Sequence, residues 1–241
     1  MKRICAVLAA VLLLPTLAHA RAYSGGGAGS VYGLPGLVAR YDASVSSSIT
    51  IATGVSQWND LSGAGNHLKQ GTGAAQPTVS SGGILFNGTS QFLKATAFTL
   101  NQPETVYLVG QQVTWTVNRA VYDGNAANSM QLVQTVTTPN ITVFAGGGGN
   151  GNTGWVIATN AVITGLFNGA SSATRVNQGA ALTDNAGANN AGGFTLGAIG
   201  NSTGFTNILV FEVIIYSGAH STAQQTAIIS FLEAKWGLPQ I

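Results

Sequence analysis

Alternation of apolar and polar positions is the main pattern along the chain beyond residue 34. Short runs of β-branched and aromatic residues recur, and clusters of Gly, Asn and Pro bound each run. Examples lie at 84–86, 105–109, 141–144 and 208–216. No long helical pattern interrupts these runs. The pattern therefore predicts an all-β protein, a two-sheet antiparallel β-sandwich of the jelly-roll type.

One segment near the C-terminus has a helical pattern instead. Ser221 and Gln224 have the spacing of a capping box, and apolar residues follow at helical spacing from 227 to 236. Gly237 is a typical helix stop. We expect one short C-terminal α-helix that covers an edge or an end of the sandwich. Trp236 is interpreted as its packing anchor rather than as a platform for a ligand.

The first 20 residues have the pattern of a cleavable signal peptide. A basic start precedes an apolar run at 4–14, and a small-x-small pattern ends at Ala20. The run is shorter than the roughly 20 residues that span a bilayer. We therefore expect a secreted protein, located outside the cell, in a periplasm or on a cell surface. Residues 21–33 are expected to form a Gly/Ser-rich linker, and 34–241 a single domain.

The charge balance excludes one class of partner. The chain has nine Lys plus Arg and seven Asp plus Glu, and removal of Lys2 and Arg3 with the signal peptide leaves seven of each. No basic patch is available for phosphates, so a nucleic acid partner is not expected. A polar, uncharged surface suits neutral ligands such as sugars, and it suits extracellular structural proteins equally well.

Several segments in order resemble the LamG-like branch of the concanavalin A-like lectin/glucanase superfamily. They are GLVARYDAS (36–44), VSQWNDLSGAGNHLKQ (55–70), QPTV (76–79), ILFNGTSQFLKA (84–95) and a C-terminal block from 167 to 238 that ends in FEVIIYSGAHSTAQQTAIISFLEAKWGL (211–238). The resemblance implies a jelly roll of two antiparallel sheets. It also implies a calcium ion, since LamG-like domains often bind one. Asn87 stands where the family commonly has Asp, which removes one potential cation ligand.

The stretch WNDLSGAGNH (58–67) permits three interpretations. Asp60, Ser62 and Asn66 can hydrogen-bond nearby backbone groups, which favours a structural turn. Asp60, Asn66 and Asp42 could instead supply oxygen ligands to calcium. In the third interpretation, His67 or Asn66 contacts a sugar directly.

The acidic residues lack the spacing of a known catalytic motif. Glycosidases need two carboxyl groups that flank the scissile bond, and alternation on one strand would place such a pair on one face. The acids are isolated in the sequence, at Asp42, Asp60, Glu104, Asp123, Asp184, Glu212 and Glu233. We therefore predict that the chain is not an enzyme, and a polysaccharide hydrolase or lyase is the less favoured hypothesis.

These observations lead to a functional hypothesis, a non-catalytic carbohydrate-binding or adhesion module whose partner is a glycan or a cell-surface polysaccharide. The candidate ligand-binding residues are Trp155, His67, Asn66 and Tyr122, because aromatic rings stack on sugars and polar side chains orient hydroxyls. Trp115 is assigned to the core by its strand phase. The alternative hypothesis is a structural or assembly module of a cell surface, matrix or virus particle that binds protein.

Overall fold

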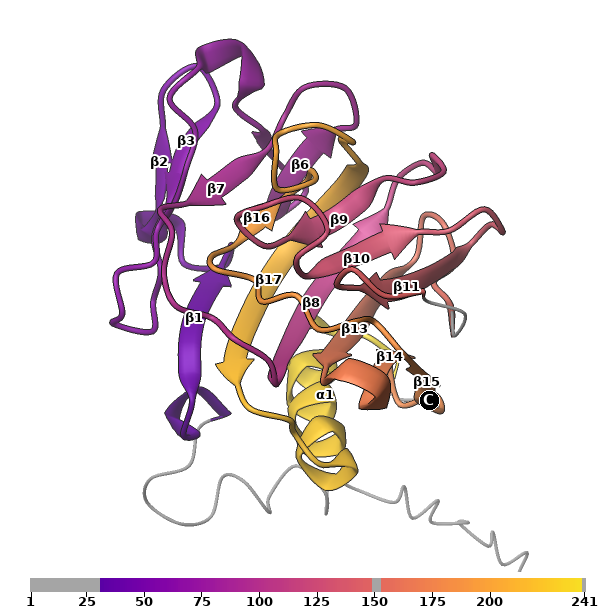
Figure 1. The fold of residues 1–241 in the computed structure, drawn as a ribbon. Helices are drawn as coiled ribbons and strands as arrows, with labels where there is room; N and C mark the ends of the chain where they lie inside the picture. The colour runs from indigo at the N-terminus through magenta and orange to yellow at the C-terminus, as the bar shows by residue number, and fades with distance from the viewer. Residues whose placement is uncertain (1–30, 149–152, 240–241) are drawn as a thin grey trace, which may run out of the picture.

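A computed structural model describes residues 31–148 and 153–239 as two packed antiparallel sheets with one α-helix (Figure 1). This architecture confirms the predicted two-sheet β-sandwich. The predicted signal peptide and residues 21–30 of the predicted linker lie outside the described residues. In the described part of the chain, no helix has the length and apolar character needed to cross a bilayer.

Each sheet is assembled from strands that are distant in sequence. The eight-stranded sheet, called sheet A, has the order β15 (Leu182–Asp184), β14 (Ser172–Val176), β13 (Asn160–Phe167), β8 (Glu104–Gln112), β17 (Asn207–Ser217), β6 (Gly83–Asn87) and β5 (Thr78–Ser80), with β1 (Leu37–Asp42) also paired to β17. The nine-stranded sheet, called sheet B, has the order β12 (Thr153–Gly154), β11 (Asn140–Phe144), β10 (Gln131–Gln134), β9 (Ala120–Asp123), β16 (Thr195–Leu196), β7 (Leu93–Ala95), β4 (Leu68–Lys69), β3 (Val55–Trp58) and β2 (Ile49–Ile51). Four short 3-10 helices accompany the strands, η1 (Val31–Gly33), η2 (Ser46–Ser48), η3 (Gly73–Ala75) and η4 (Gly169–Ser171).

A β-bulge in β17 determines which residues face the core. Val210 pairs with Gly110 and Glu212 pairs with Val109, so Phe211 is an extra residue in the strand. Before the bulge, even-numbered residues such as Val210 pack in the core between the sheets. After the bulge, odd-numbered residues such as Val213 do so. The change of phase places Glu212 on the outer face of sheet A, although it remains fully buried.

The helix α1 (Thr222–Trp236) begins and ends as the sequence predicts. The Ser221 hydroxyl accepts from the Gln224 backbone N–H and the Gln224 side chain accepts from the Ser221 N–H, which completes the capping box. Gly237 has φ of 63°, the left-handed conformation that favours glycine. The helix therefore has the predicted local signals at both of its ends.

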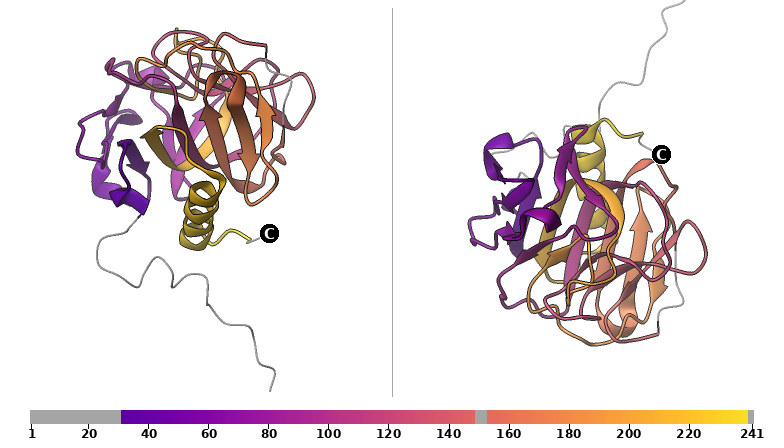
Figure 2. Two further views of the ribbon diagram at one scale, coloured as in Figure 1. Left: turned by 60° about the horizontal axis from the view of Figure 1, so that its bottom comes forward. Right: turned by 90° about the horizontal axis from the view of Figure 1, so that it is seen from above.

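The position of α1 differs from the expected edge or end of the sandwich. Ile228, Ile229 and Leu232 pack on outward-facing residues of β8 and β17, so the helix covers the outer face of sheet A (Figure 2). Trp236 packs against Phe211 with ring centroids 5.3 Å apart, which confirms its role as a packing anchor. Burial of this second apolar layer explains why both faces of β17 are hydrophobic.

Five residues form an ionic cluster at the edge of this layer: Tyr32, Arg40, Asp42, Glu212 and Lys235. The Lys235 ammonium lies 2.5 Å from an Asp42 carboxylate oxygen and 2.6 Å from one of Glu212. The Arg40 guanidinium lies 2.5 Å from Asp42 and stacks 3.5 Å above the Tyr32 ring. The Tyr32 hydroxyl donates to Glu212 at 2.8 Å.

The ionic cluster corrects the predicted boundary between linker and domain. Val31 is buried, and its carbonyl accepts a hydrogen bond from the Tyr216 hydroxyl. Residues 31–33, assigned to the linker from their Gly/Ser-rich context, therefore belong to the folded domain. The tyrosine in this segment contacts partners more than 170 residues away, which a local reading of composition does not reveal.

Substitution of Lys235 by methionine should destabilise the fold strongly. It would leave the buried Asp42 and Glu212 without their shared ammonium, which costs about 3–5 kcal/mol. Burial acts to raise the pKa of Asp42, but hydrogen bonds from Lys235 and Ser44 hold that pKa below its usual value. The stabilisation should therefore be present above about pH 4 and be lost as pH falls further. Urea unfolding across pH measures the difference, and Lys69→Met is the exposed-lysine control, expected to change stability by less than about 0.5 kcal/mol.

Glu104 is a buried carboxyl group without compensation. It starts β8, is 0% exposed, and neither of its carboxyl oxygens has a hydrogen-bond partner among the described residues. The Tyr122 hydroxyl also has no hydrogen-bond partner among the described residues. Burial raises the pKa of Tyr122, and the charge of Glu104 raises that pKa further. Burial raises the pKa of Glu104 to about 8, so the native state holds this side chain protonated at neutral pH.

Glu104→Gln should remove a pH dependence of stability. A carboxyl pKa raised from 4.5 in the unfolded chain to about 8 in the native state stabilises the fold below pH 4.5, and this contribution is lost as pH rises to 8. Relative to the unsubstituted protein, the variant should gain about 3 kcal/mol in unfolding free energy between pH 5 and pH 7.5. Denaturant unfolding at several pH values measures this gain, and a constant difference would contradict the assignment. His220, whose pKa is lowered by burial, is common to both proteins and cancels.

Candidate functional site

The loop at 58–67 is organised around the Asp60 carboxylate. One oxygen accepts from the backbone N–H groups of Arg40 at 2.9 Å and Ser62 at 2.8 Å. The other accepts from the Ser62 hydroxyl at 2.8 Å and the Asn66 N–H at 3.0 Å. Asp60 is only 7% exposed. Its four hydrogen bonds hold the loop against β1, which is the arrangement that the structural-turn interpretation predicts.

The remaining polar residues of the loop also bond to the protein. The Asn66 amide donates to the Val38 carbonyl at 2.9 Å, and the Asn66 carbonyl accepts from the Tyr41 hydroxyl. His67 Nδ1 accepts from the Asp60 N–H at 3.0 Å. Both Asn66 and His67 are half-buried. The groups that were candidates for direct sugar contact thus fix the turn, and their exposure for a ligand is partial.

The three residues proposed as calcium ligands bond to different groups, although Arg40 contacts both Asp60 and Asp42. Asp60 and Asn66 lie in the loop, whereas Asp42 joins the ionic cluster on the outer face of sheet A. Among the residues that the structure describes, no group of three or more His, Cys, Asp and Glu side chains is placed to hold a metal ion. Calcium binding at this loop remains a prediction from the sequence and from the resemblance.

Substitution of Asp60 should therefore act on stability. Asp60→Ala leaves two backbone donors of the loop and one of β1 without their acceptor, and we expect a loss of about 2–4 kcal/mol in unfolding free energy. Ser62→Ala removes only hydroxyl contacts and should cost about 1 kcal/mol. Chemical denaturation measures both values. Equal losses for the two variants would show that the carboxylate does not organise the loop.

Tyr122 does not have the exposure that a sugar-stacking residue needs. It is 1% exposed and lies in the core, with its ring centroid 5.5 Å from that of Phe194 and 6.4 Å from that of Phe167. The ligand-binding role predicted for Tyr122 is therefore corrected to a packing role. Large aromatic side chains bury most of their area in this way, and the sequence pattern alone does not distinguish the two uses.

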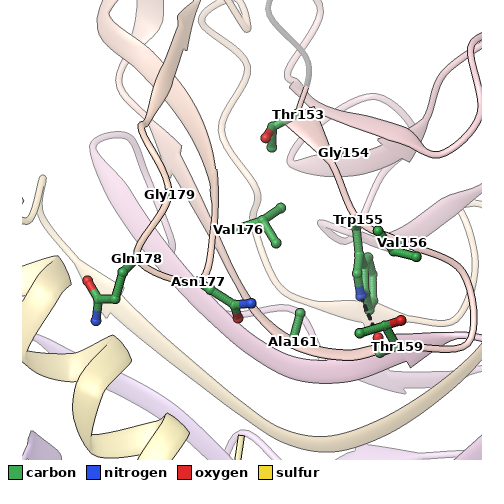
Figure 3. A pocket seen from close by; sticks show the side chains of 10 residues that line it. All are labelled: Thr153, Gly154, Trp155, Val156, Thr159, Ala161, Val176, Asn177, Gln178 and Gly179. Carbon is green, nitrogen blue, oxygen red and sulfur yellow. Dashed lines mark hydrogen bonds between the residues drawn. The ribbon is translucent and has the colours of Figure 1, made fainter. Parts of the chain in front are cut away.

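A cavity of about 610 Å³ opens beside Trp155, between β12 and the turn after β14 (Figure 3). We call it the Trp155 groove. Its lining combines small apolar side chains with hydroxyl and amide groups, a composition typical of ligand pockets. The lining residues are Thr153, Gly154, Trp155, Val156, Thr159, Ala161, Val176, Asn177, Gln178 and Gly179.

Trp155 itself forms the wall of this groove from inside the core. The residue is 0% exposed, and its indole N–H donates to the Thr159 carbonyl at 3.1 Å. Its ring face is therefore not open for a sugar to stack on, which corrects the role predicted for it. Val156, in contrast, is 61% exposed, and Figure 3 shows Val176 pointing into the space across from the indole. The apolar surface of the groove comes from these small side chains.

The turn at 177–179 supplies the polar side of the groove. Asn177 has φ of 48°, and its side-chain oxygen accepts from the Val162 N–H at 2.8 Å. This bond leaves the two amide N–H donors of Asn177 for a ligand. Arg175 donates to the Gly179 carbonyl at 2.7 Å, and Gln178 reaches away to α1, where it donates to Ser230 at 3.0 Å. The turn is therefore held from two sides.

A second cavity, also about 610 Å³, lies on the outward face of sheet B over β2, β3 and β4. We call it the Lys69 groove. Most of its lining residues have polar side chains, and Lys69 supplies its one positive charge. The lining residues are Thr50, Ala52, Ser56, Gln57, Lys69, Gln70, Gly71 and Gln76.

Acidic side chains are missing from the lining of both grooves. All seven Asp and Glu residues lie in the described chain, and each is buried. The two carboxylates that meet, Asp42 and Glu212, are paired with Lys235 and Arg40. The grooves therefore provide hydrogen bonds and apolar contacts, and neither holds a carboxylate pair of the glycosidase kind.

Sequence reasoning did not find Asn177 or Lys69. The segment RVNQG around Asn177 has a turn composition, which predicts a loop but not a wall of a groove. Lys69 is one charge at a strand end. Its relevance depends on its neighbours on β2 and β3, and these are set by strand register rather than by local sequence.

Several solved structures with a similar fold come from carbohydrate-active proteins. Trypanosoma rangeli sialidase superposes with a TM-score of 0.62 at 13% identity, and the match covers 86% of this chain and 34% of the sialidase. Domain 4 of AbnA, a GH43 extracellular arabinanase from Geobacillus stearothermophilus, in complex with arabinotriose, gives 0.60 at 14% identity, covering 80% of this chain and 98% of that domain. A GH54 α-L-arabinofuranosidase gives 0.54 at 16% identity, covering 73% of this chain and 50% of the enzyme. No protein-family model and no curated protein matches the sequence.

These similarities define a fold class, the two-sheet β-sandwich, which this chain shares with domains of carbohydrate-active proteins. The chain spans about a third of the length of the sialidase chains that it matches. The predicted non-catalytic binding or adhesion module, with an assembly module as its alternative, is wrong, since the similar structures are glycoside hydrolases or their domains. The low identities show the fold alone, and they do not show that this chain is catalytic.

Proposed function

We propose that the chain is a carbohydrate-active domain of the glycoside-hydrolase type that engages a neutral, arabinose-type oligosaccharide in the Trp155 groove. The main support for this proposal is the match to the arabinanase domain. The match covers 98% of that domain, which was solved in complex with arabinotriose. The match to the sialidase covers a much smaller part of that chain. We give the arabinanase domain more weight than the sialidase, because the match includes nearly all of that domain and only about a third of the sialidase.

The lining of the groove suits a neutral sugar. Val156 and Val176 offer an apolar surface to the C–H groups of a sugar ring, and Asn177 offers two amide donors to its hydroxyls. The hydroxyls of Thr153 and Thr159 add donors and acceptors at the rim. The cavity of about 610 Å³ is in the range of small-molecule pockets. Its rigid turn limits the entropy cost of binding.

Two further features belong to the same proposal. The strand pattern and the resemblance in the sequence support a concanavalin A-like jelly roll, and the pattern of residues 1–20 supports export to the cell exterior. Bond cleavage is assigned to no residue of the groove, because its lining holds no carboxyl group.

Asn177→Asp tests the groove with minimal structural change. Aspartate keeps the oxygen that accepts from the Val162 N–H and tolerates the left-handed backbone, but it lacks the two amide donors. Binding of arabinotriose should weaken about tenfold, which corresponds to about 1.4 kcal/mol, while the unfolding free energy changes by less than about 0.5 kcal/mol. Calorimetric titration of residues 21–241 with arabinotriose measures the first value, and urea unfolding the second.

A matched pair of valine variants separates the groove from the general surface. Val156→Ser alters an exposed lining residue, whereas Val136→Ser alters a residue that is 76% exposed and does not line the groove. Only the former should weaken binding, by about threefold. Chromatography of the same mixtures after long incubation detects released arabinose. Absence of both binding and release with arabinan and arabinotriose would overturn the proposal.

A further inference from the structure

A row of outward-facing side chains crosses sheet B at the Lys69 groove. Thr50 pairs with Gln57, Gln57 with Lys69, and Lys69 with Lys94, so the four residues lie side by side on β2, β3, β4 and β7. Adjacent strands are about 4.8 Å apart, so the groove from Thr50 to Lys69 is about 10 Å wide. Figure 1 shows β2, β3 and β7 together at one side of the sandwich.

The polar wall of the groove is already hydrogen-bonded. Gln76 donates to the Gln70 carbonyl at 2.8 Å and accepts from the Gly54 N–H at 2.8 Å. The Gln70 side chain accepts from the Thr72 N–H at 3.0 Å and donates to the Phe92 carbonyl at 3.3 Å. Both glutamines are buried. These hydrogen bonds fix the shape of the wall, and both side-chain amides already have partners within the protein.

The two lysines of the row are in different situations. Like charges that are directly opposite on neighbouring strands repel each other. The Lys94 ammonium is held by the carbonyls of Asn125 at 2.8 Å and Gly200 at 2.6 Å. The Lys69 side chain is exposed and makes no hydrogen bond or ion pair with the described residues. No lining residue of its groove is acidic.

We propose that the Lys69 groove binds an anionic saccharide, a sugar unit that carries a carboxylate or a sulfate. Lys69 would pair with the anionic group, and Gln57 and Thr50, next in the row, would contact ring hydroxyls. The neighbouring charge of Lys94 adds to the attraction for an anion. The inference rests on the proposed carbohydrate activity, but it assigns a second site with a different ligand charge. The Trp155 groove takes the neutral unit.

The test compares charged and neutral ligands on residues 21–241, the expected mature chain. The probes are trigalacturonic acid, a sulfated galactose trisaccharide and uncharged galactotriose, titrated by calorimetry in 50 mM and 500 mM NaCl. The protein should bind at least one acidic trisaccharide about fivefold more tightly than galactotriose, and the preference should fall at high salt because the ion pair is exposed. Comparison of the two acidic probes identifies the anionic group.

Single-charge variants locate the effect. Lys69→Gln should lose the fivefold preference, and Lys69→Arg should keep it. Arg119→Gln removes one positive charge from a residue outside the groove and is the matched control. Equal affinity for acidic and neutral trisaccharides, or an equal loss in Lys69→Gln and Arg119→Gln, would overturn the inference. Unchanged arabinotriose binding by Lys69→Gln separates this result from failure at the Trp155 groove.

Discussion

The ionic cluster on the outer face of sheet A joins segments of the protein that are far apart in the sequence. Lys235 comes from the C-terminal helix, Glu212 from the central strand β17, and Arg40 from β1. Tyr32 adds the segment that precedes the first strand. Two carboxylates and two cations with short contacts satisfy one another at a buried site, where any one charge alone would be strongly unfavourable. Attachment of the helix and of the first residues of the domain both depend on this balance.

The cluster in turn depends on the bulge at Phe211. Asp42 and Glu212 face each other in register across β1 and β17, and both must point to the same outer face. Without the extra residue, Glu212 would have the phase of a core position. The segment FEVIIY contains this glutamate, and alternation read from the sequence would assign it to the core, because the sequence does not show the bulge that shifts the phase. The consequence appears only when three strands are placed together.

The sequence predicted well what depends on neighbouring residues. Period-two runs predicted the strands and the sandwich, and Ser221, Gln224 and Gly237 predicted the limits of the helix. Contacts between distant segments could not be predicted in the same way. The sequence pattern did not reveal that Val31 is buried or that α1 lies on a sheet face, since both depend on long-range packing. The candidate site was missed for the same reason, because a groove is a property of several strands.

Several acidic residues in this protein organise loops and strand ends by accepting hydrogen bonds. Asp123 accepts hydrogen bonds from the backbone of Ser129 and Gly200, as Asp60 does from its own loop. A glycosidase needs one carboxyl group with a raised pKa beside an ionised one, within reach of the ligand. The pair Asp42 and Glu212 does not meet this condition, because cations hold both groups and the pKa of Asp42 is lowered.

The residues that remain for recognition are therefore the polar groups that the fold leaves without a partner. The aromatic residues chosen from the sequence, Tyr122 and Trp155, are taken up by the core. Burial of large rings stabilises the sandwich, and this competes with their use as exposed platforms. The Asn177 amide donors and the Lys69 ammonium are different, since no contact of the described chain uses them and each lies in a groove with fixed walls. Under the proposed function, specificity for sugars should follow from these two polar groups.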